Sequence, residues 1–157
     1  MIQRTIENRI EDKFFKKKSI ILYGARQVGK TTLLESIVNK RNEKVMWLNC
    51  DEPDVRKILT DVTSTRIKSI IGNSSIVVID EAQRIENIGL VIKLFVDNLK
   101  NIQVVATGSS SLELADKISE PLTGRKYLFT LYPLSFREMA DSTSLSEEKR
   151  MLEHRLV

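Results

Sequence analysis

Residues 24–31 read Gly24-Ala25-Arg26-Gln27-Val28-Gly29-Lys30-Thr31 and match the pattern G-x-x-x-x-G-K-[ST]. The apolar run from Ile20 to Tyr23 precedes this stretch and predicts a short buried strand. Apolar residues at helical spacing follow it, namely Leu33, Leu34, Ile37 and Val38. A strand, a glycine-containing loop and a helix in this order form a phosphate-binding loop, or P-loop, because backbone N–H groups and the positive end of the helix dipole point at the phosphates. The sequence therefore predicts a nucleotide site here.

Each part of the loop has its own expected role. Lys30 is expected to bridge β- and γ-phosphate oxygens, and the Thr31 hydroxyl to bind Mg²⁺. The residues expected to contact the nucleotide in this segment are Gly24, Ala25, Arg26, Gln27, Val28, Gly29, Lys30, Thr31 and Thr32.

Composition sets broad limits on the class of protein. The chain has 157 residues, 41% hydrophobic and 29% charged, which suits one globular domain. No signal peptide or apolar run of membrane-spanning length is visible, and the single Cys50 fits a reducing cytoplasm, so we expect a cytoplasmic protein without membrane partners. The net charge of +4 is compatible with a nucleotide or a nucleic acid and specific to neither. We interpret the basic run Lys16 to Lys18 as a solvated strand edge, so a nucleic-acid partner has no support from sequence.

Strand-like and helix-like segments alternate along the chain. Strands are expected at residues 20–23, 44–49, 75–79, 102–106 and 127–131, the third being a β-branched run typical of burial on both faces. Helical spacing predicts an amphipathic helix over residues 2–14 and further helices at 31–39, 65–71 and 88–99, with a short one starting at Pro53. Capping-box patterns at Ser110–Glu113 and Ser135–Glu138 predict two more helix starts. This alternation predicts an α/β fold with a parallel sheet between helical layers.

Two groups of polar residues follow expected strands at the carboxyl edge of that sheet, where ligands of such folds gather. Asp80 directly follows the strand at 75–79 and is placed to hold Mg²⁺, while Glu81 can act as base or orienter for an attacking water. Thr107 and Ser109 follow the next strand and are candidates for contact with the γ-phosphate or the water. Both hydroxyls can instead serve as helix caps.

Arg125 lies in Thr123-Gly124-Arg125, just before the last expected strand. It is a candidate arginine finger, which would neutralise charge on the transferring phosphoryl group, often from a neighbouring subunit. An exposed loop arginine without such a role is the alternative.

Four ordered segments resemble one known family: GARQVGKTTLL at 24–34, VVIDEAQRI at 77–85, VVATGSSSLEL at 104–114 and LTGRKYLFTLYPLSFREM at 122–139. Together they are similar to the AAA+-type ATPase domain of large bacterial and archaeal ATPases of poorly defined role. The resemblance implies a three-layer P-loop NTPase fold with a five-stranded parallel sheet in the order 5-1-4-3-2. It also implies ATP and Mg²⁺ as cofactors, Lys30 and Thr31 as P-loop residues, and Asp80 and Glu81 as the Walker B pair. Thr107 or Ser109 would occupy the sensor region, and Arg125 would be the finger.

The chain departs from the family in length, since members are typically more than twice as long. We expect residues 1–145 to form the ATPase core, with an amphipathic helix and basic lead-in at 1–18. Residues 146–157 are expected to begin a helical lid or C-terminal region. A homo-oligomer or an additional C-terminal domain is the expected partner besides the nucleotide.

Three functions follow from these residues. The first is an Mg²⁺-dependent ATP hydrolase that couples turnover to conformational work on an unknown partner. The second is a nucleotide-operated switch or interaction module with little turnover. The third is a small P-loop kinase, which the Asp80-Glu81 pair disfavours because that pair suits water activation.

Overall fold

Five parallel strands form the central sheet of the computed structural model, which describes residues 2–109 and 111–142. The strands are β1 (Ser19–Tyr23), β2 (Val45–Asn49), β3 (Ile76–Asp80), β4 (Gln103–Gly108) and β5 (Lys126–Thr130). Their spatial order is β2-β3-β4-β1-β5, which read in reverse is the expected order 5-1-4-3-2. All four strand pairings are parallel. The expected fold class and strand order are confirmed.

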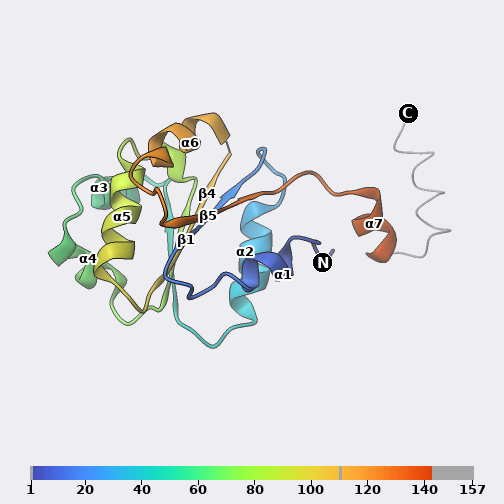
Figure 1. Ribbon diagram of the computed structural model, residues 1–157, viewed down its shortest axis with the longest axis horizontal. Helices are drawn as coiled ribbons and strands as arrows, with labels where there is room; N and C mark the ends of the chain where they lie inside the picture. Colours follow the sequence, from blue (N-terminus) through green and yellow to red (C-terminus); the bar gives the residue numbers. More distant parts are fainter. Residues whose placement is uncertain (1, 110, 143–157) are drawn as a thin grey trace.

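Helices cover both faces of this sheet, as Figure 1 shows. On one face lie α1 (Glu7–Glu11) and α2 (Lys30–Asn39). On the other lie α3 (Pro53–Thr60), α4 (Ser64–Ile71), α5 (Ile88–Asn98) and α6 (Ser111–Ser119). A short 3₁₀ turn, η1 (Ala82–Arg84), follows β3, and α7 (Phe136–Ser142) stands apart from the sheet at the end of the segment after β5.

Alternate residues of the inner strands supply the two halves of the core. Ile20, Leu22 and Val78 pack with α1 and α2, whereas Ile21 and Val77 pack towards α5. These residues are fully buried because a parallel sheet between helices has no solvated face. The β-branched run at 76–79 was therefore a sound indication of a central strand.

The N-terminal helix is shorter than the periodicity predicts. Instead of residues 2–14, it spans Glu7–Glu11, with Ile10 and Phe14 buried as expected. The N–H of Thr5 donates to Glu138 Oε1 at 2.9 Å, and Phe15 adopts a left-handed φ of 56°, so tertiary contacts and a turn limit the helix at its two ends. The expectation of a long amphipathic helix was wrong in extent.

The two capping boxes have different outcomes. At Ser135–Glu138 the Ser135 hydroxyl accepts from the N–H of Glu138 at 3.2 Å, and Glu138 Oε2 accepts from the N–H of Ser135 at 2.9 Å. This reciprocal pair is a capping box, so that prediction is confirmed. The box at Ser110–Glu113 and the expected helix beyond residue 146 lie outside the described residues and side chains.

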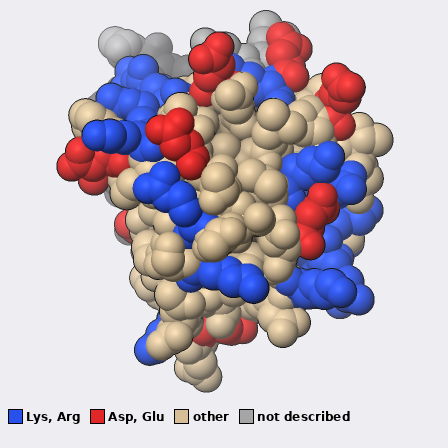
Figure 2. Space-filling view, turned by 90° about the vertical axis from the view of Figure 1, so that its left-hand side faces the viewer, with Lys and Arg blue, Asp and Glu red and all other residues tan. Residues whose placement is uncertain are grey.

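Charge is mixed on the side of the molecule where α3 and α4 lie. Figure 2 shows several groups of basic residues there, with acidic and neutral residues between them. In the described part of the chain no helix is both long and apolar enough to cross a membrane.

Candidate nucleotide site

The loop between β1 and α2 requires glycine at both ends for steric reasons. A Cβ at Gly24 would lie 2.7 Å from the carbonyl oxygen of Leu131 and 2.8 Å from a methyl carbon of Val28. Gly29 has a φ of +95°, which side chains disfavour. The chain therefore turns tightly from the end of the strand into the first turn of α2, the geometry that brings successive N–H groups to a phosphate.

Lys30 is held at the first residues of this loop. Its side chain is 5% exposed, and its ammonium donates to the carbonyl oxygens of Gly24 at 2.9 Å and Ala25 at 3.1 Å. Within the described residues no carboxylate lies in ion-pair distance of it. The loop thus carries a buried positive charge that only neutral carbonyls solvate, which favours an anion beside it.

Asp80 is the centre of a hydrogen-bond network at the end of β3. The Thr31 hydroxyl donates to Asp80 Oδ2 at 2.9 Å, and the Thr107 hydroxyl donates to Oδ1. Asp80 is 6% exposed, so this network holds a buried carboxylate against the first turn of α2. The structure thereby brings together Thr31 and Asp80, the two residues expected to hold a metal.

Thr107 supports the end of β3 from the neighbouring strand. Its side chain is fully buried, its hydroxyl proton goes to Asp80, and its oxygen accepts from the N–H of Glu81 at 3.1 Å. These bonds occupy the hydroxyl within the network. Thr107 therefore orients Asp80 and Glu81, and its direct contact with a nucleotide stays a prediction.

Glu81 turns away from the strand in a left-handed conformation, with φ 52° and ψ 43°. A non-glycine residue in this region is uncommon and carries backbone strain. Its carboxylate accepts from Gln83 Nε2 at 2.6 Å. The backbone bend and this amide together fix the position of the expected base.

Gln83 directly follows the Asp80-Glu81-Ala82 segment, and its position allowed contact with the nucleotide, a partner or water. Its amide nitrogen also donates to the Ser109 hydroxyl at 2.9 Å, and its amide oxygen accepts from the Ser109 N–H at 3.4 Å. Lys117 donates to the Gln83 carbonyl at 2.8 Å, and the residue is 8% exposed. Gln83 thus joins Glu81 to Ser109, a link that only its place two residues after Glu81 could have indicated.

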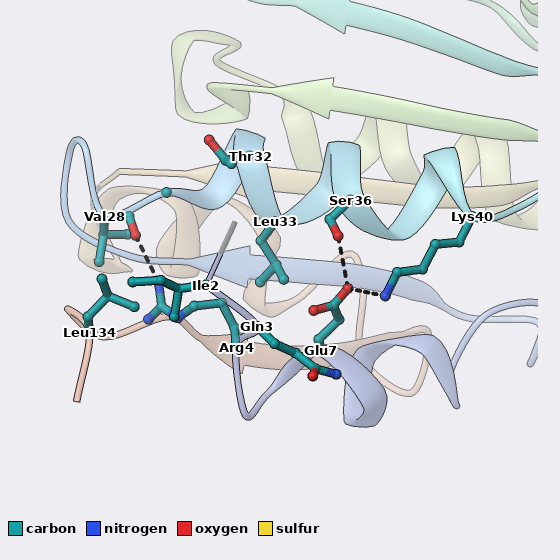
Figure 3. Close-up of a pocket in the computed structure, with 11 residues that line it drawn as sticks. Ile2, Gln3, Arg4, Glu7, Val28, Thr32, Leu33, Ser36, Lys40 and Leu134 are labelled. Carbon is teal, nitrogen blue, oxygen red and sulfur yellow. Dashed lines mark hydrogen bonds and ion pairs between the residues drawn. The ribbon is translucent and has the colours of Figure 1, made fainter. Parts of the chain in front are cut away.

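A cavity of about 500 Å³ lies along α2 beside the loop (Figure 3). Ile2, Val28, Leu33 and Leu134 form apolar parts of its wall, and Gln3 also lines it. Because Val28 and Gly29 of the phosphate loop both line the cavity, it continues the phosphate site. Residues of the N-terminal segment were not expected in it.

Glu7 closes the far end of this cavity. Its carboxylate, 3% exposed, accepts from the Ser36 hydroxyl at 3.1 Å and from the Lys40 ammonium at 2.6 Å. Figure 3 shows these three side chains together towards the C-terminal end of α2. These bonds connect α1 to α2 and hold the side chains at this end of the cavity in place.

Arg4 connects the loop to α7. Its guanidinium donates to the Val28 carbonyl at 3.2 Å, to the Tyr132 carbonyl, and to Glu138 Oε1 at 3.2 Å. Arg4 and Glu138 are 9% and 5% exposed. Burial opposes ionisation of Glu138, but N–H donors of Ser135 and Thr5 and the Arg4 side chain outweigh it and lower its pKa from 4.5 to about 2. No sequence pattern indicated this pair.

Arg125 lies away from the residues described above. It precedes Lys126, which pairs with Ser19 at the amino end of the sheet, while the loop follows Tyr23 at the carboxyl end. Its guanidinium donates to Asp97 at 2.8 Å. Arg125 therefore does not approach the nucleotide site of its own chain, and action on a neighbouring subunit stays a prediction.

A comparison with known protein families identifies the family to which this chain belongs. A family model described as an AAA domain matches residues 16–140, a span that contains the loop, Asp80, Glu81 and all five strands. The chain belongs to this AAA domain family. P-loop ATPases among the solved structures share the fold of this AAA domain, in keeping with the resemblance in the four sequence segments.

Three similar proteins illustrate the match. An uncharacterised protein of Methanocaldococcus jannaschii is 29% identical over 150 residues, which cover 94% of this chain and 34% of the relative. The Walker-type ATPase of Pyrococcus abyssi has a TM-score of 0.64 at 21% identity, covering 90% of this chain and 56% of that one. Domain III of the Thermotoga maritima replication initiation protein DnaA has a TM-score of 0.64 at 16% identity, covering 98% and 72%. The chain thus spans about a third of the curated relative's length.

Proposed function

We propose that this AAA domain binds ATP with Mg²⁺, hydrolyses it, and couples hydrolysis to conformational work on a partner. The observation that carries the proposal is the hydrogen bond from the Thr31 hydroxyl to Asp80 Oδ2, at 2.9 Å. It lies beside a loop in which the Lys30 ammonium is bonded to neutral carbonyl oxygens. Family membership supports nucleotide binding in general. The nucleotide, the metal and the turnover are our proposal.

The residues present fit Mg²⁺. Thr31 and Asp80 offer one hydroxyl and one carboxylate, the hard oxygen ligands that Mg²⁺ prefers, and Mg²⁺ commonly uses one or two protein ligands together with phosphates. When bound, the ion would withdraw charge from the β- and γ-phosphate oxygens. Thr107 would keep the Asp80 carboxylate in place, since its hydroxyl donates to the other oxygen.

Glu81 is our candidate base. In hydrolysis a water oxygen forms a bond to the γ-phosphorus, the bond from that phosphorus to the β–γ bridging oxygen breaks, and the water proton passes to the Glu81 carboxylate. Lys30 would stabilise the negative charge that develops on the phosphate oxygens. Gln83 would orient the Glu81 carboxylate, because it donates to one of its oxygens at 2.6 Å.

The cavity beside the loop suits a nucleotide base. Its volume of about 500 Å³ and its apolar wall at Ile2, Val28 and Leu134 match a flat aromatic ring. We propose that adenine occupies this cavity.

A measurement of phosphate release by the 157-residue chain with ATP and Mg²⁺ tests the proposal. The parent is expected to release phosphate, Lys30→Ala to lose ATP binding, and Glu81→Gln to keep binding but lose release by about 10²-fold or more. Lys57→Ala, at an exposed lysine of α3, is the matched control and should behave as the parent. ATP binding without release in the parent would reject hydrolysis by this chain.

One observation favours the alternative of a switch with little turnover. Glu81 is hydrogen-bonded to Gln83 at 2.6 Å, and a base held this way is less free to take a proton. In that case ATP would bind and change the contacts of α7 through Val28 and Arg4 without release. Bound ATP with altered amide exchange in residues 132–142 and no phosphate release would support this alternative.

The remaining expectations concern the protein as a whole. A cytoplasmic location, a homo-oligomer in which Arg125 acts on a neighbour, and a lid or C-terminal domain after the core all stay predictions. Light scattering with and without ATP tests the oligomer.

A further inference from the structure

Another hollow lies at the amino end of the sheet, away from the nucleotide site. It has a volume of about 320 Å³ and is lined by four basic residues, Lys17, Lys18, Lys100 and Arg125. Apolar residues such as Leu99 form the rest of its wall. We call these four basic residues, with the neighbouring Lys13 and Lys16, the basic rim.

A buried side chain builds the turn that carries much of the basic rim. Gln103 is 1% exposed; its oxygen accepts from the N–H of Phe15 at 2.6 Å, and its amide nitrogen donates to the Lys18 carbonyl at 3.0 Å. Phe15 and Lys17 have left-handed φ values of 56° and 61°. Hydrogen bonds with Gln103 thus hold both ends of the turn in a strained conformation. A lysine run that is only solvated does not need such support.

The basic rim is held together against its own repulsion. The ammonium groups of Lys13 and Lys18 both lie over the Tyr127 ring, 5.3 and 5.2 Å from its centre. A ring face attracts cations, so one aromatic side chain holds two of the positive charges of the basic rim.

Little negative charge offsets these groups. In the part of the chain that the structure describes, no carboxylate lies in ion-pair distance of Lys13, Lys16, Lys17, Lys18 or Lys100. Asp97 is the acidic residue lining the hollow, and it is paired with Arg125 at 2.8 Å. Unpaired cations around a concavity raise the local concentration of anions.

We propose that the basic rim binds the phosphate backbone of duplex nucleic acid. Several separate cations on one rim match the regularly spaced charges of a duplex better than a single small anion. Single strands are disfavoured because Lys13 and Lys18 already lie over the Tyr127 ring, on which a base would have to stack. A lipid surface is disfavoured because the cations surround a hollow, and one partly exposed apolar side chain in the turn, Phe15 at 39%, is far less than the broad apolar face that inserts into a membrane.

This proposal does not depend on ATP hydrolysis, because the rim and the nucleotide site lie at opposite ends of the sheet. The test is the fluorescence anisotropy of a short labelled duplex of mixed sequence, titrated with the 157-residue chain at several salt concentrations. Lys17→Glu/Lys100→Glu is the test variant, and Lys57→Glu/Lys68→Glu, at exposed lysines of α3 and α4, makes the same change in net charge. Circular dichroism melting confirms that both variants fold.

The parent should bind the duplex, and the rim variant should bind at least about tenfold more weakly than the control variant, with a salt slope reduced by about two. Equal losses in the two variants would show that only net charge matters and would overturn the proposal. So would absence of duplex binding by the parent, tighter binding of a single strand of equal length, or rim-dependent binding to anionic lipid vesicles without binding to the duplex.

Discussion

At the carboxyl end of the sheet, Lys30 and Asp80 are 5% and 6% exposed, and hydrogen bonds hold both in one position. At the amino end, Lys17 and Lys100 are exposed and have no carboxylate in ion-pair distance within the described residues. Fixed, buried charges suit a small ligand with defined atoms, because no reorganisation is needed on binding. Exposed charges suit a large anion that tolerates many positions.

Two ion pairs, one at each end of the sheet, differ in the same way in what they contribute to the stability of the fold. Arg4–Glu138, beside the nucleotide site, is 9% and 5% exposed, whereas Arg125–Asp97, at the hollow, is 40% and 39% exposed. Removal of one partner from a buried pair leaves an uncompensated charge, while an exposed pair contributes little. The first pair should therefore matter for folding and the second for charge at the surface.

The largest expected effect is the loss of Arg4. Arg4→Met leaves Glu138 buried without its cation and leaves the carbonyls of Val28 and Tyr132 without that donor. We expect a loss of about 3–5 kcal/mol in the free energy of unfolding, measured by urea denaturation. Arg9→Met, at an exposed arginine of α1, should change it by less than about 0.5 kcal/mol. Similar values for the two variants would show that the buried pair does not stabilise the fold.

The next effect is a dependence of stability on pH through Glu138. Its pKa is about 2 in the folded chain against an ordinary value of 4.5, so its stabilising contribution is complete above about pH 5 and is lost as the pH falls towards 2. The free energy of unfolding of the parent should exceed that of Glu138→Gln by about 2–3 kcal/mol near pH 6, and this difference should vanish near pH 2. Urea denaturation at a series of pH values measures this difference. With the exposed Glu86→Gln as control, a difference that stayed constant with pH would contradict the shift.

Local patterns indicated the candidate-site residues that lie next to one another in sequence. The P-loop pattern located residues 24–31, and a β-branched run followed by Asp80 and Glu81 located the end of β3, because both signals are carried by adjacent positions. The strand order came from resemblance to a family, since propensity alone does not order parallel strands. The fold class and order were both right.

Contacts between distant residues were not predictable in this way. Arg4 and Glu138 are 134 positions apart, and Gln103 reaches back 85 positions to Lys18, so no periodicity connects them. The N-terminal helix was overestimated for the same reason, because Thr5 bonds to Glu138 in place of a helical partner. The sequence of a lysine run is the same whether the run is freely solvated or held in a fixed turn. The hydrogen bonds of Gln103 show that this run is held in a turn.

A smaller effect is expected from Gln83, and it tests whether fixed geometry at the carboxyl end serves catalysis. Gln83→Ala removes the donor to Glu81 and Ser109 but no predicted ligand of the nucleotide. We expect kcat for phosphate release to fall about tenfold with KM for ATP unchanged, since orientation of the base matters only in the transition state. Asn98→Ala, which removes an exposed amide of α5 bonded to Leu94, is the control. An increase in KM with unchanged kcat would assign Gln83 to binding instead.

The smallest expected effect on stability is at Asp97. A substitution there also tests whether Arg125 contributes to duplex binding at the amino end of the sheet. Asp97→Asn removes one charge of an exposed pair, so the free energy of unfolding should change by less than about 1 kcal/mol. Because the same change frees the Arg125 guanidinium beside three lysines, duplex affinity should rise by about threefold or more at low salt, measured by anisotropy. Asp61→Asn, at an exposed residue between α3 and α4, gives the same gain in net charge away from the rim. If both variants raised affinity equally, Arg125 would have no local part in binding, and the contrast between the two ends would rest on the lysines alone.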